Sequence, residues 1–204
     1  MESMIAIRSA ASCPAPADIR MEAEEITRRV ITKGNDPEEI QALIHELTTG
    51  KTGCLNRALT VLAGKEDNRP MISLAETEKA SVWLLGWRPS KDATDIHDHG
   101  ESLAGIKVLE GTVEEVVFTP PDWTRFYKMD GGETERMTRL LSAGTLLDVP
   151  KPYVHIFDSW KQVDFASSLH VYSPPLAEMR LYREEYREDD ATGLRLSNHW
   201  KANP

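Results

Sequence analysis

Three histidines in the second half of the chain have the residue type and spacing of a metal site. His97 and His99 stand two positions apart in the segment IHDH at 96–99, and His155 follows much later in the chain. Side chains at positions i and i+2 of a β-strand point to the same face, so both imidazoles of the pair can reach one ion. A third imidazole from a distant strand completes a facial set of three. A histidine pair alone is structural about as often as it binds metal, so the assignment depends on its surroundings.

A second group of polar residues occupies alternating positions of one predicted strand. Ser168, His170 and Tyr172 occur in the segment SLHVYSPP at 168–175. Strand alternation places all three on one face, where each can hydrogen-bond its neighbour and hold the phenol in a fixed rotamer. Such a phenol can donate or accept a proton beside a metal. The alternative is an ordinary internal hydrogen bond between strand residues.

The elements that position these residues differ between the two ends of the chain. Residues 1–16 contain Pro14 and Pro16 and are predicted to form a flexible N-terminal tail. Residues 17–66 are predicted to form a helical subdomain, because apolar residues recur at helical spacing. Asp36, Pro37 and two following glutamates have the pattern of a helix start.

Residues 67–204 are predicted to form a β-barrel that holds the metal site. Short β-rich runs alternate here with Gly, Pro, Asp and Asn, at the spacing of a sandwich or barrel. The fold class is therefore mainly β, with the helical subdomain packed on the barrel. The predicted strands are Met71–Leu74, Ala80–Trp87, Ala104–Glu110, Thr112–Phe118, Leu146–Val149, Tyr153–Phe157, Phe165–Tyr172, Met179–Tyr186 and Leu194–Ser197.

Composition excludes several classes of protein. The chain has 204 residues, and 24 Lys and Arg against 33 Asp and Glu give a net charge of −9. This acidic balance argues against nucleic-acid binding. No apolar run approaches the ~18 residues of a membrane span, and the N-terminus does not resemble a signal peptide. The two cysteines, Cys13 and Cys54, are expected to be free thiols. We expect a cytoplasmic protein, a monomer or a small homo-oligomer, with no membrane partner.

The β-rich part resembles the cupin family of double-stranded β-helix (jelly-roll) barrels. Its first motif, HxH followed by a glutamate and then a glycine, matches at 97–99 and at Gly111. Its second motif, a glycine, five residues, a proline, four residues and a histidine, matches at Gly144, Pro150 and His155. The resemblance implies a cupin barrel with these histidines as metal ligands.

The glutamate of ordinary cupins is missing. Its position falls at Leu103 or Ala104, and neither side chain can bind a metal. The usual 2-His-1-carboxylate set carries one negative ligand, whereas three neutral imidazoles leave the charge of a dication uncompensated. An anionic substrate ligand such as a thiolate is then favoured, although a carboxylate or hydroxide is equally permitted.

Among cupins, the chain resembles the cysteine dioxygenases, which oxidise a thiol to a sulfinic acid with Fe(II) and O₂. The resemblance covers about 69–200, and its most specific stretch is 168–175. In that family Ser-x-His-x-Tyr-Ser-Pro-Pro carries a relay whose tyrosine hydroxyl reaches toward the iron. The resemblance therefore implies that Ser168, His170 and Tyr172 are the catalytic residues.

The substrate end departs from the family. A cysteine that forms a thioether with the tyrosine in animal members is Ala104 here, so that crosslink is absent. The family binds the substrate carboxylate through an arginine, for which Arg69 is the candidate, although a surface role beside Pro70 is an equal alternative. Met179 matches a position on the pocket rim. We take Arg69 and Met179 as the predicted substrate-binding residues.

The leading hypothesis is an Fe(II)-dependent thiol dioxygenase that converts a small, cysteine-like thiol and O₂ to the sulfinic acid. His97, His99 and His155 would be the iron ligands. A thiol dioxygenase for 3-mercaptopropionate or mercaptosuccinate is the first alternative. A metal-binding cupin without oxygenase activity is the second, and a cupin isomerase or hydrolase that uses Mn, Ni or Zn is the third.

Overall fold

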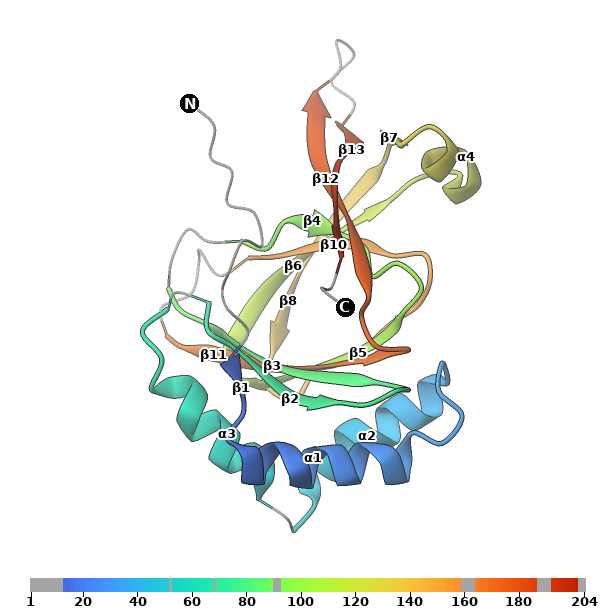
Figure 1. Ribbon diagram of the computed structural model, residues 1–204. Coiled ribbons are helices and arrows are strands. Elements are labelled where there is room, and N and C mark those ends of the chain that lie inside the picture. The colour runs from blue at the N-terminus through green and yellow to red at the C-terminus, as the bar shows by residue number, and fades with distance from the viewer. Residues whose placement is uncertain are drawn as a thin grey trace.

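Two curved β-sheets face each other, and three helices cover the outer face of one of them (Figure 1). This computed structural model describes residues 13–51, 53–67, 69–89, 93–158, 164–186 and 192–201. The fold is mainly β, with two facing sheets and an N-terminal helical layer, as the sequence predicts.

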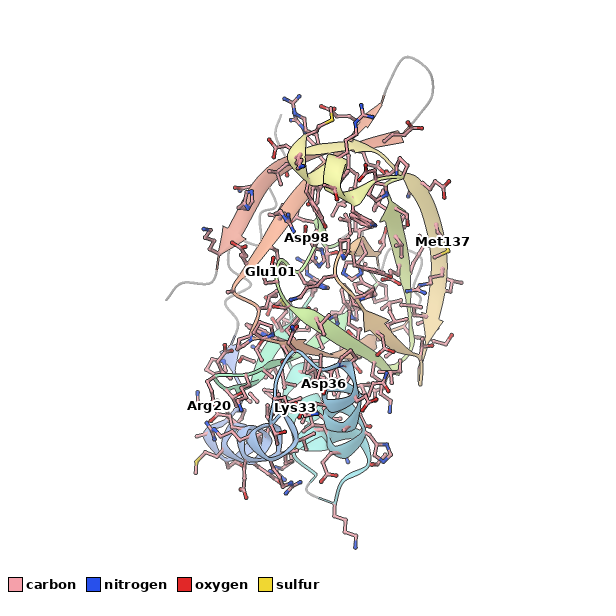
Figure 2. All side chains as sticks on the ribbon, turned by 90° about the vertical axis from the view of Figure 1, so that its right-hand side faces the viewer. Arg20, Lys33, Asp36, Asp98, Glu101 and Met137 are labelled. Carbon is pink, nitrogen blue, oxygen red and sulfur yellow. The ribbon has the colours of Figure 1, made fainter. Side chains whose placement is uncertain are left out.

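The helical layer consists of α1 (Ala17–Val30), α2 (Pro37–Thr49) and α3 (Cys54–Ala63). The predicted start of α2 is confirmed, because the Asp36 side chain accepts a hydrogen bond from the Glu38 backbone N–H and Pro37 occupies the first turn (Figure 2). The helices lie within the predicted subdomain 17–66, whose exact boundaries stay a prediction. Within the described residues, none of the helices has the length and apolar character of a membrane span.

The sheet beneath the helices has six strands. Its order is β1 (Cys13–Pro14), β2 (Met71–Glu76), β3 (Ser81–Trp87), β11 (Ala166–Ser173), β5 (Leu103–Glu110) and β9 (Leu146–Val149). Strand β1 lies in the predicted flexible tail. That prediction is wrong for Cys13 and Pro14, which pair in parallel with β2, and Ala15 beside them is buried. The rest of the tail, residues 1–12, lies outside the described residues.

The opposite sheet has seven strands. Its order is β7 (Gly131–Glu133), β13 (Thr192–Lys201), β12 (Glu178–Tyr186), β4 (Ile96–His97), β10 (Val154–Asp158), β6 (Thr112–Thr119) and β8 (Glu135–Ser142). Each of the nine predicted strands overlaps one of the strands in these sheets. The sequence analysis missed β1, β4, β7, β8 and the short helix α4 (Trp123–Lys128). Strand β8 was missed because most of its residues are exposed, including Met137, so it has no apolar alternation (Figure 2).

Strand β11 is buried on both faces, and the two faces have different composition. Leu169 and Val171 belong to the apolar cluster that the helices cover. Ser168, His170 and Tyr172 alternate with them and point between the two sheets. The helical layer therefore provides apolar burial on one side of the strand and leaves the other side for polar groups.

Helix α2 approaches β5 closely at Gly105. A Cβ atom added at Gly105 would clash with the Ile40 side chain and lie 2.7 Å from Ile44 Cδ1. Both isoleucines are buried in the core under the helices. The absence of a side chain at Gly105 is therefore what allows α2 to lie on the sheet.

We expect Gly105→Ala to lower the free energy of unfolding by roughly 1–3 kcal/mol, because the added methyl group overpacks this contact. Gly132→Ala is the matched control, since its added Cβ would lie 3.8 Å from Phe126, an ordinary contact. Urea unfolding of both variants measures the difference. Equal stabilities would show that α2 moves to accommodate the methyl group without cost.

Candidate metal centre

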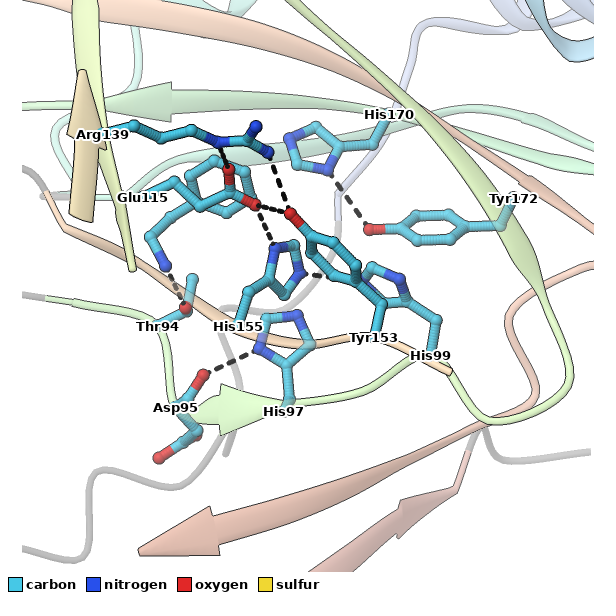
Figure 3. A network of polar contacts seen from close by, with 11 residues as sticks. Thr94, Asp95, His97, His99, Glu115, Arg139, Tyr153, His155, His170 and Tyr172 are labelled. Carbon is cyan, nitrogen blue, oxygen red and sulfur yellow. Dashed lines mark hydrogen bonds and ion pairs between the residues drawn. The ribbon is translucent and has the colours of Figure 1, made fainter. Parts of the chain in front are cut away.

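His97, His99 and His155 converge inside the barrel (Figure 3). His97 lies on β4, His99 in the turn that follows, and His155 on β10, directly opposite His97 in the strand pairing. The three side chains are 7%, 4% and 0% exposed. One possible ligand nitrogen from each lies within 4.8 Å of the others.

His97 and His99 reach the same point although strand β4 ends at His97. Strand β4 contains only Ile96 and His97, so the predicted strand does not include His99. The chain still follows β12, because the Asp98 N–H donates to the Arg180 carbonyl at 3.1 Å. The Asp98 carboxylate does not join the histidines. It accepts from Tyr182 Oη and forms an ion pair with Arg180 Nε, both at 2.8 Å.

Hydrogen bonds leave two of the imidazoles with a bare Nε2 atom. The Nδ1–H of His97 donates to the Asp95 carbonyl, and that of His155 donates to Glu115 Oε1, each at 2.7 Å. Both acceptors lack protons, so each Nδ1 must carry one. The Nε2 atoms of His155 and His99 are 3.3 Å apart. Two nitrogens bound to one cation at about 2.1 Å are separated by roughly 3.0–3.4 Å.

Burial keeps these imidazoles uncharged. Desolvation lowers the pKa of His97 and holds the pKa of His99 and of His155 well below the ordinary value. Neutral imidazole is the form that binds a metal. The donor set, its spacing and its protonation state therefore fit a divalent metal ion.

A chain of hydrogen bonds leads from Trp87 to the Tyr172 hydroxyl. Trp87 Nε1–H donates to Ser168 Oγ at 2.9 Å, Ser168 Oγ lies 2.8 Å from His170 Nε2, and His170 Nδ1 lies 3.2 Å from Tyr172 Oη. Indole only donates, so Ser168 Oγ accepts from Trp87. Neutral His170 carries one ring proton, so it donates one of its two bonds and accepts the other. The Tyr172 ring meets the His99 ring edge-on, with centroids 5.0 Å apart.

Burial also fixes the protonation of this relay. Desolvation, with a smaller contribution from His97, lowers the pKa of His170 to about 3, and burial raises the pKa of Tyr172. At neutral pH, His170 is therefore neutral and Tyr172 carries its proton. Ala104 on β5 lies directly opposite Tyr172 on β11. Ala104 is the position that holds the crosslinking cysteine in the animal members that the sequence resembles.

The predicted substrate-binding residues share a cavity with the metal site. The cavity has a volume of about 100 Å³. It is lined by Arg69, Met71, Trp83, Leu85, Thr94, His97, Tyr172, Leu176 and Met179. Arg69 thus faces the interior, where its Nη1 donates to the Ala93 carbonyl at 2.7 Å.

A larger cavity of about 400 Å³ reaches His99 and Tyr153. Its lining also includes Trp123, Tyr127 and Arg180, but neither Tyr172 nor Arg69. The smaller cavity is thus the one in which a candidate metal ligand, the phenol and a guanidinium come together.

The sequence analysis missed three residues that contact the metal ligands or their partners. Glu115 accepts from His155, and Arg139 and Tyr153 in turn hydrogen-bond Glu115. The available signal was a glutamate in phase with Val113 and Val117, two buried positions of the predicted strand. A charged residue at an inward-facing strand position needs a partner.

The matches to known proteins agree with this geometry. The sequence model of the family "Cysteine dioxygenase type I" matches residues 8–185. The chain belongs to this family. It is also 28% identical to the cysteine dioxygenase type 1 of Danio rerio over 105 residues, which is 51% of this chain and 50% of that protein. The chain thus spans about half the length of this curated relative.

Several solved structures are similar to the barrel. The TT1209 protein of Thermus thermophilus is 21% identical with a TM-score of 0.43, covering 57% of this chain and 94% of that one. An uncharacterized protein with a double-stranded β-helix domain from Klebsiella pneumoniae is 15% identical with a TM-score of 0.43, covering 57% and 86%.

We expect acid to destabilise the metal-free protein through its buried histidines. Burial lowers the folded-state pKa of these imidazoles, so below about pH 6.5 the unfolded chain binds protons that the folded chain does not. The buried histidines contribute their full stability above this pH, and that contribution decreases as the pH falls. For His170 the decrease continues down to its folded-state pKa of about 3. Each histidine adds a slope of up to about 1.4 kcal/mol per pH unit.

Urea unfolding between about pH 7 and about pH 5 measures this slope. His170→Gln should reduce this slope by the contribution of one buried histidine. His45→Gln is the control, because His45 is exposed on α2. A wild-type stability that does not change over this range would contradict the expectation.

Proposed function

We propose that this protein is an Fe(II)-dependent thiol dioxygenase that converts a small, cysteine-like thiol and O₂ to the sulfinic acid. One observation carries the proposal. Three neutral imidazoles converge beside the Tyr172 ring, and the metal-binding group that they form contains no carboxylate among the described residues. Membership of the cysteine dioxygenase type I family supports the same reaction.

His97, His99 and His155 would hold the iron. A bound Fe(II) would supply a site for the substrate thiolate and for O₂, so that both oxygen atoms end on sulfur and no external reductant is needed. The three ligands bring no negative charge of their own. An anionic sulfur ligand therefore fits this site better than it fits a site that already contains a carboxylate.

Tyr172 is the proton donor of the site. With the proton of neutral His170 on Nδ1, the Tyr172 hydroxyl accepts from it, which fixes the oxygen and leaves the phenol proton for a group in the cavity. Ser168 and Trp87 hold the ring of His170 from the other side. Burial raises the pKa of Tyr172, so the phenol stays a donor at neutral pH.

Arg69 is positioned to bind the substrate carboxylate. It lines the same cavity as His97 and Tyr172, and its bond to the Ala93 carbonyl orients the guanidinium. A guanidinium has five N–H donors and binds a carboxylate in a two-point fork. The cavity of about 100 Å³ favours a small substrate.

The cavity lining also favours a second candidate substrate, a thiol acid without an amine such as 3-mercaptopropionate. Met71, Leu85, Leu176 and Met179 make much of the wall, and the described lining contains no carboxylate. An α-ammonium group would find no countercharge on these walls. An amine-free thiol acid needs only Arg69 and the metal.

We expect the Fe(II)-reconstituted protein to consume O₂ with cysteine or 3-mercaptopropionate and to form a product heavier by two oxygen atoms. Tyr172→Phe should keep the metal but slow turnover by at least about 100-fold, because the proton donor is lost. His155→Ala should lose metal and activity together. An oxygen electrode, mass spectrometry and metal analysis measure these outcomes. No O₂ uptake with any small thiol, at full iron loading, would favour a non-oxygenase cupin.

We expect Arg69→Leu to lower kcat/KM for a thiol acid by about 10- to 150-fold, the value of a charged hydrogen bond pair. Cysteamine is the matched control, because it is a thiol without a carboxylate, and its kcat/KM should not change. Arg69→Lys should recover part of the loss. An equal loss with both substrates would mean that Arg69 acts only through its bond to the Ala93 carbonyl.

A further inference from the structure

Glu115 is a fully buried carboxylate in contact with a metal ligand. It is 0% exposed. Its Oε1 accepts from His155 Nδ1–H at 2.7 Å and from the Tyr153 hydroxyl at 3.0 Å, and its Oε2 accepts from Arg139 Nε at 2.6 Å (Figure 3). Arg139 Nη2 also donates to Tyr153 Oη at 2.9 Å. Each oxygen of the carboxylate therefore has a defined partner.

Strand pairing brings these residues together from three neighbouring strands. Glu115 on β6 lies directly opposite Arg139 on β8, and β6 also pairs with β10, which carries His155. The Arg139 side chain is 37% exposed, so it reaches inward from the open edge of the sheet. The carboxylate lies between a surface cation and the metal site.

We propose that Glu115 is a positioning residue for the metal. It orients His155 so that Nε2 faces the ion, and through His155 it provides the negative charge that the three-imidazole set lacks. Arg139 limits how much of that charge reaches the metal. This inference rests on the proposed metal site.

The other two ligands have no comparable partner. His97 donates to a neutral backbone carbonyl, and His99 Nδ1 is buried without a hydrogen-bond partner in the described part of the chain. A carboxylate that accepts from Nδ1–H draws the proton toward itself and makes Nε2 a stronger ligand. His155 is thus the one of the three ligands that is hydrogen-bonded to a carboxylate in the described part of the chain.

Arg139 should act in the opposite direction to Glu115. Burial opposes its charge, but the hydrogen bond and the negative charge of Glu115 raise its pKa, so Arg139 stays a cation. Without it, the full charge of Glu115 would act on His155. The metal-free protein would then contain an uncompensated buried charge, which a bound dication would balance.

The alternative is an ordinary buried ion pair that only stabilises the fold. In that case both Glu115→Gln and Arg139→Gln would destabilise the protein, and the affinity for metal would not change in either variant. The two roles therefore differ in a measurement that does not involve turnover.

The experiment titrates the metal-free protein with Co(II), which reports binding by its visible absorption. Glu115→Gln should raise the Kd for Co(II) by about 10- to 100-fold. Arg139→Gln should lower Kd, and Co(II) should raise its Tm by more than it raises that of wild type. In the Glu115→Gln background, Arg139→Gln should have no effect on Kd, because it acts through the carboxylate.

Glu184→Gln is the matched control. It breaks another ion pair between β8 and β12, in which Arg136 Nη1 lies 3.2 Å from Glu184 Oε1. Neither residue contacts a histidine ligand among the interactions described here, so its Kd should equal that of wild type.

An unchanged Kd in Glu115→Gln would overturn this inference while the metal site stands. Wild-type protein that binds no Co(II) would overturn the proposed metal site as well. Arg139→Gln keeps the test available if Glu115→Gln does not fold, because a Kd in Arg139→Gln that is unchanged or higher contradicts the opposing role.

Discussion

The removal of four histidines from water is the constraint on which the rest of this structure depends. His97, His99, His155 and His170 are all buried between the two sheets. Burial disfavours the imidazolium form, so each ring stays neutral, and each ring nitrogen becomes a donor or an acceptor with a fixed direction. The pattern of partners then decides their roles. His170 is satisfied on both sides by Ser168 and Tyr172, whereas one ring nitrogen of each of the other three histidines lies within 4.8 Å of the others.

The barrel can hold this polar interior because its stability comes from elsewhere. The largest apolar cluster lies between the helices and the outer face of β2, β3 and β11. A strand such as β11 can therefore contribute leucine and valine to that core and serine, histidine and tyrosine to the site, without conflict between folding and function. The helical layer is part of what makes the site possible, although it provides no residue to it.

Charge is distributed unequally across the site. At one end, Glu115 lies behind His155 and is balanced by Arg139. At the other end, Arg69 lines a cavity whose described walls are otherwise mostly apolar. A substrate with an anionic sulfur and a carboxylate would find one countercharge in a dication bound at the histidines and the other in Arg69. Because Glu115 contacts His155 and is not itself in the group of three histidines, a bound dication would keep charge for an anionic ligand.

The sequence by itself determined what depends on local periodicity and short motifs. The HxH pair, His155 in its glycine and proline spacing, the alternation of Ser168, His170 and Tyr172, the start of α2 and nine strands were all predictable, because each is encoded within about ten neighbouring residues. Only the tertiary structure decided which distant residues meet. The contact of Glu115 with Arg139 and His155 and the bond from Trp87 to Ser168 depend on strand register across the sheets. Register is a property of paired strands, so a single sequence read along its length does not reveal it.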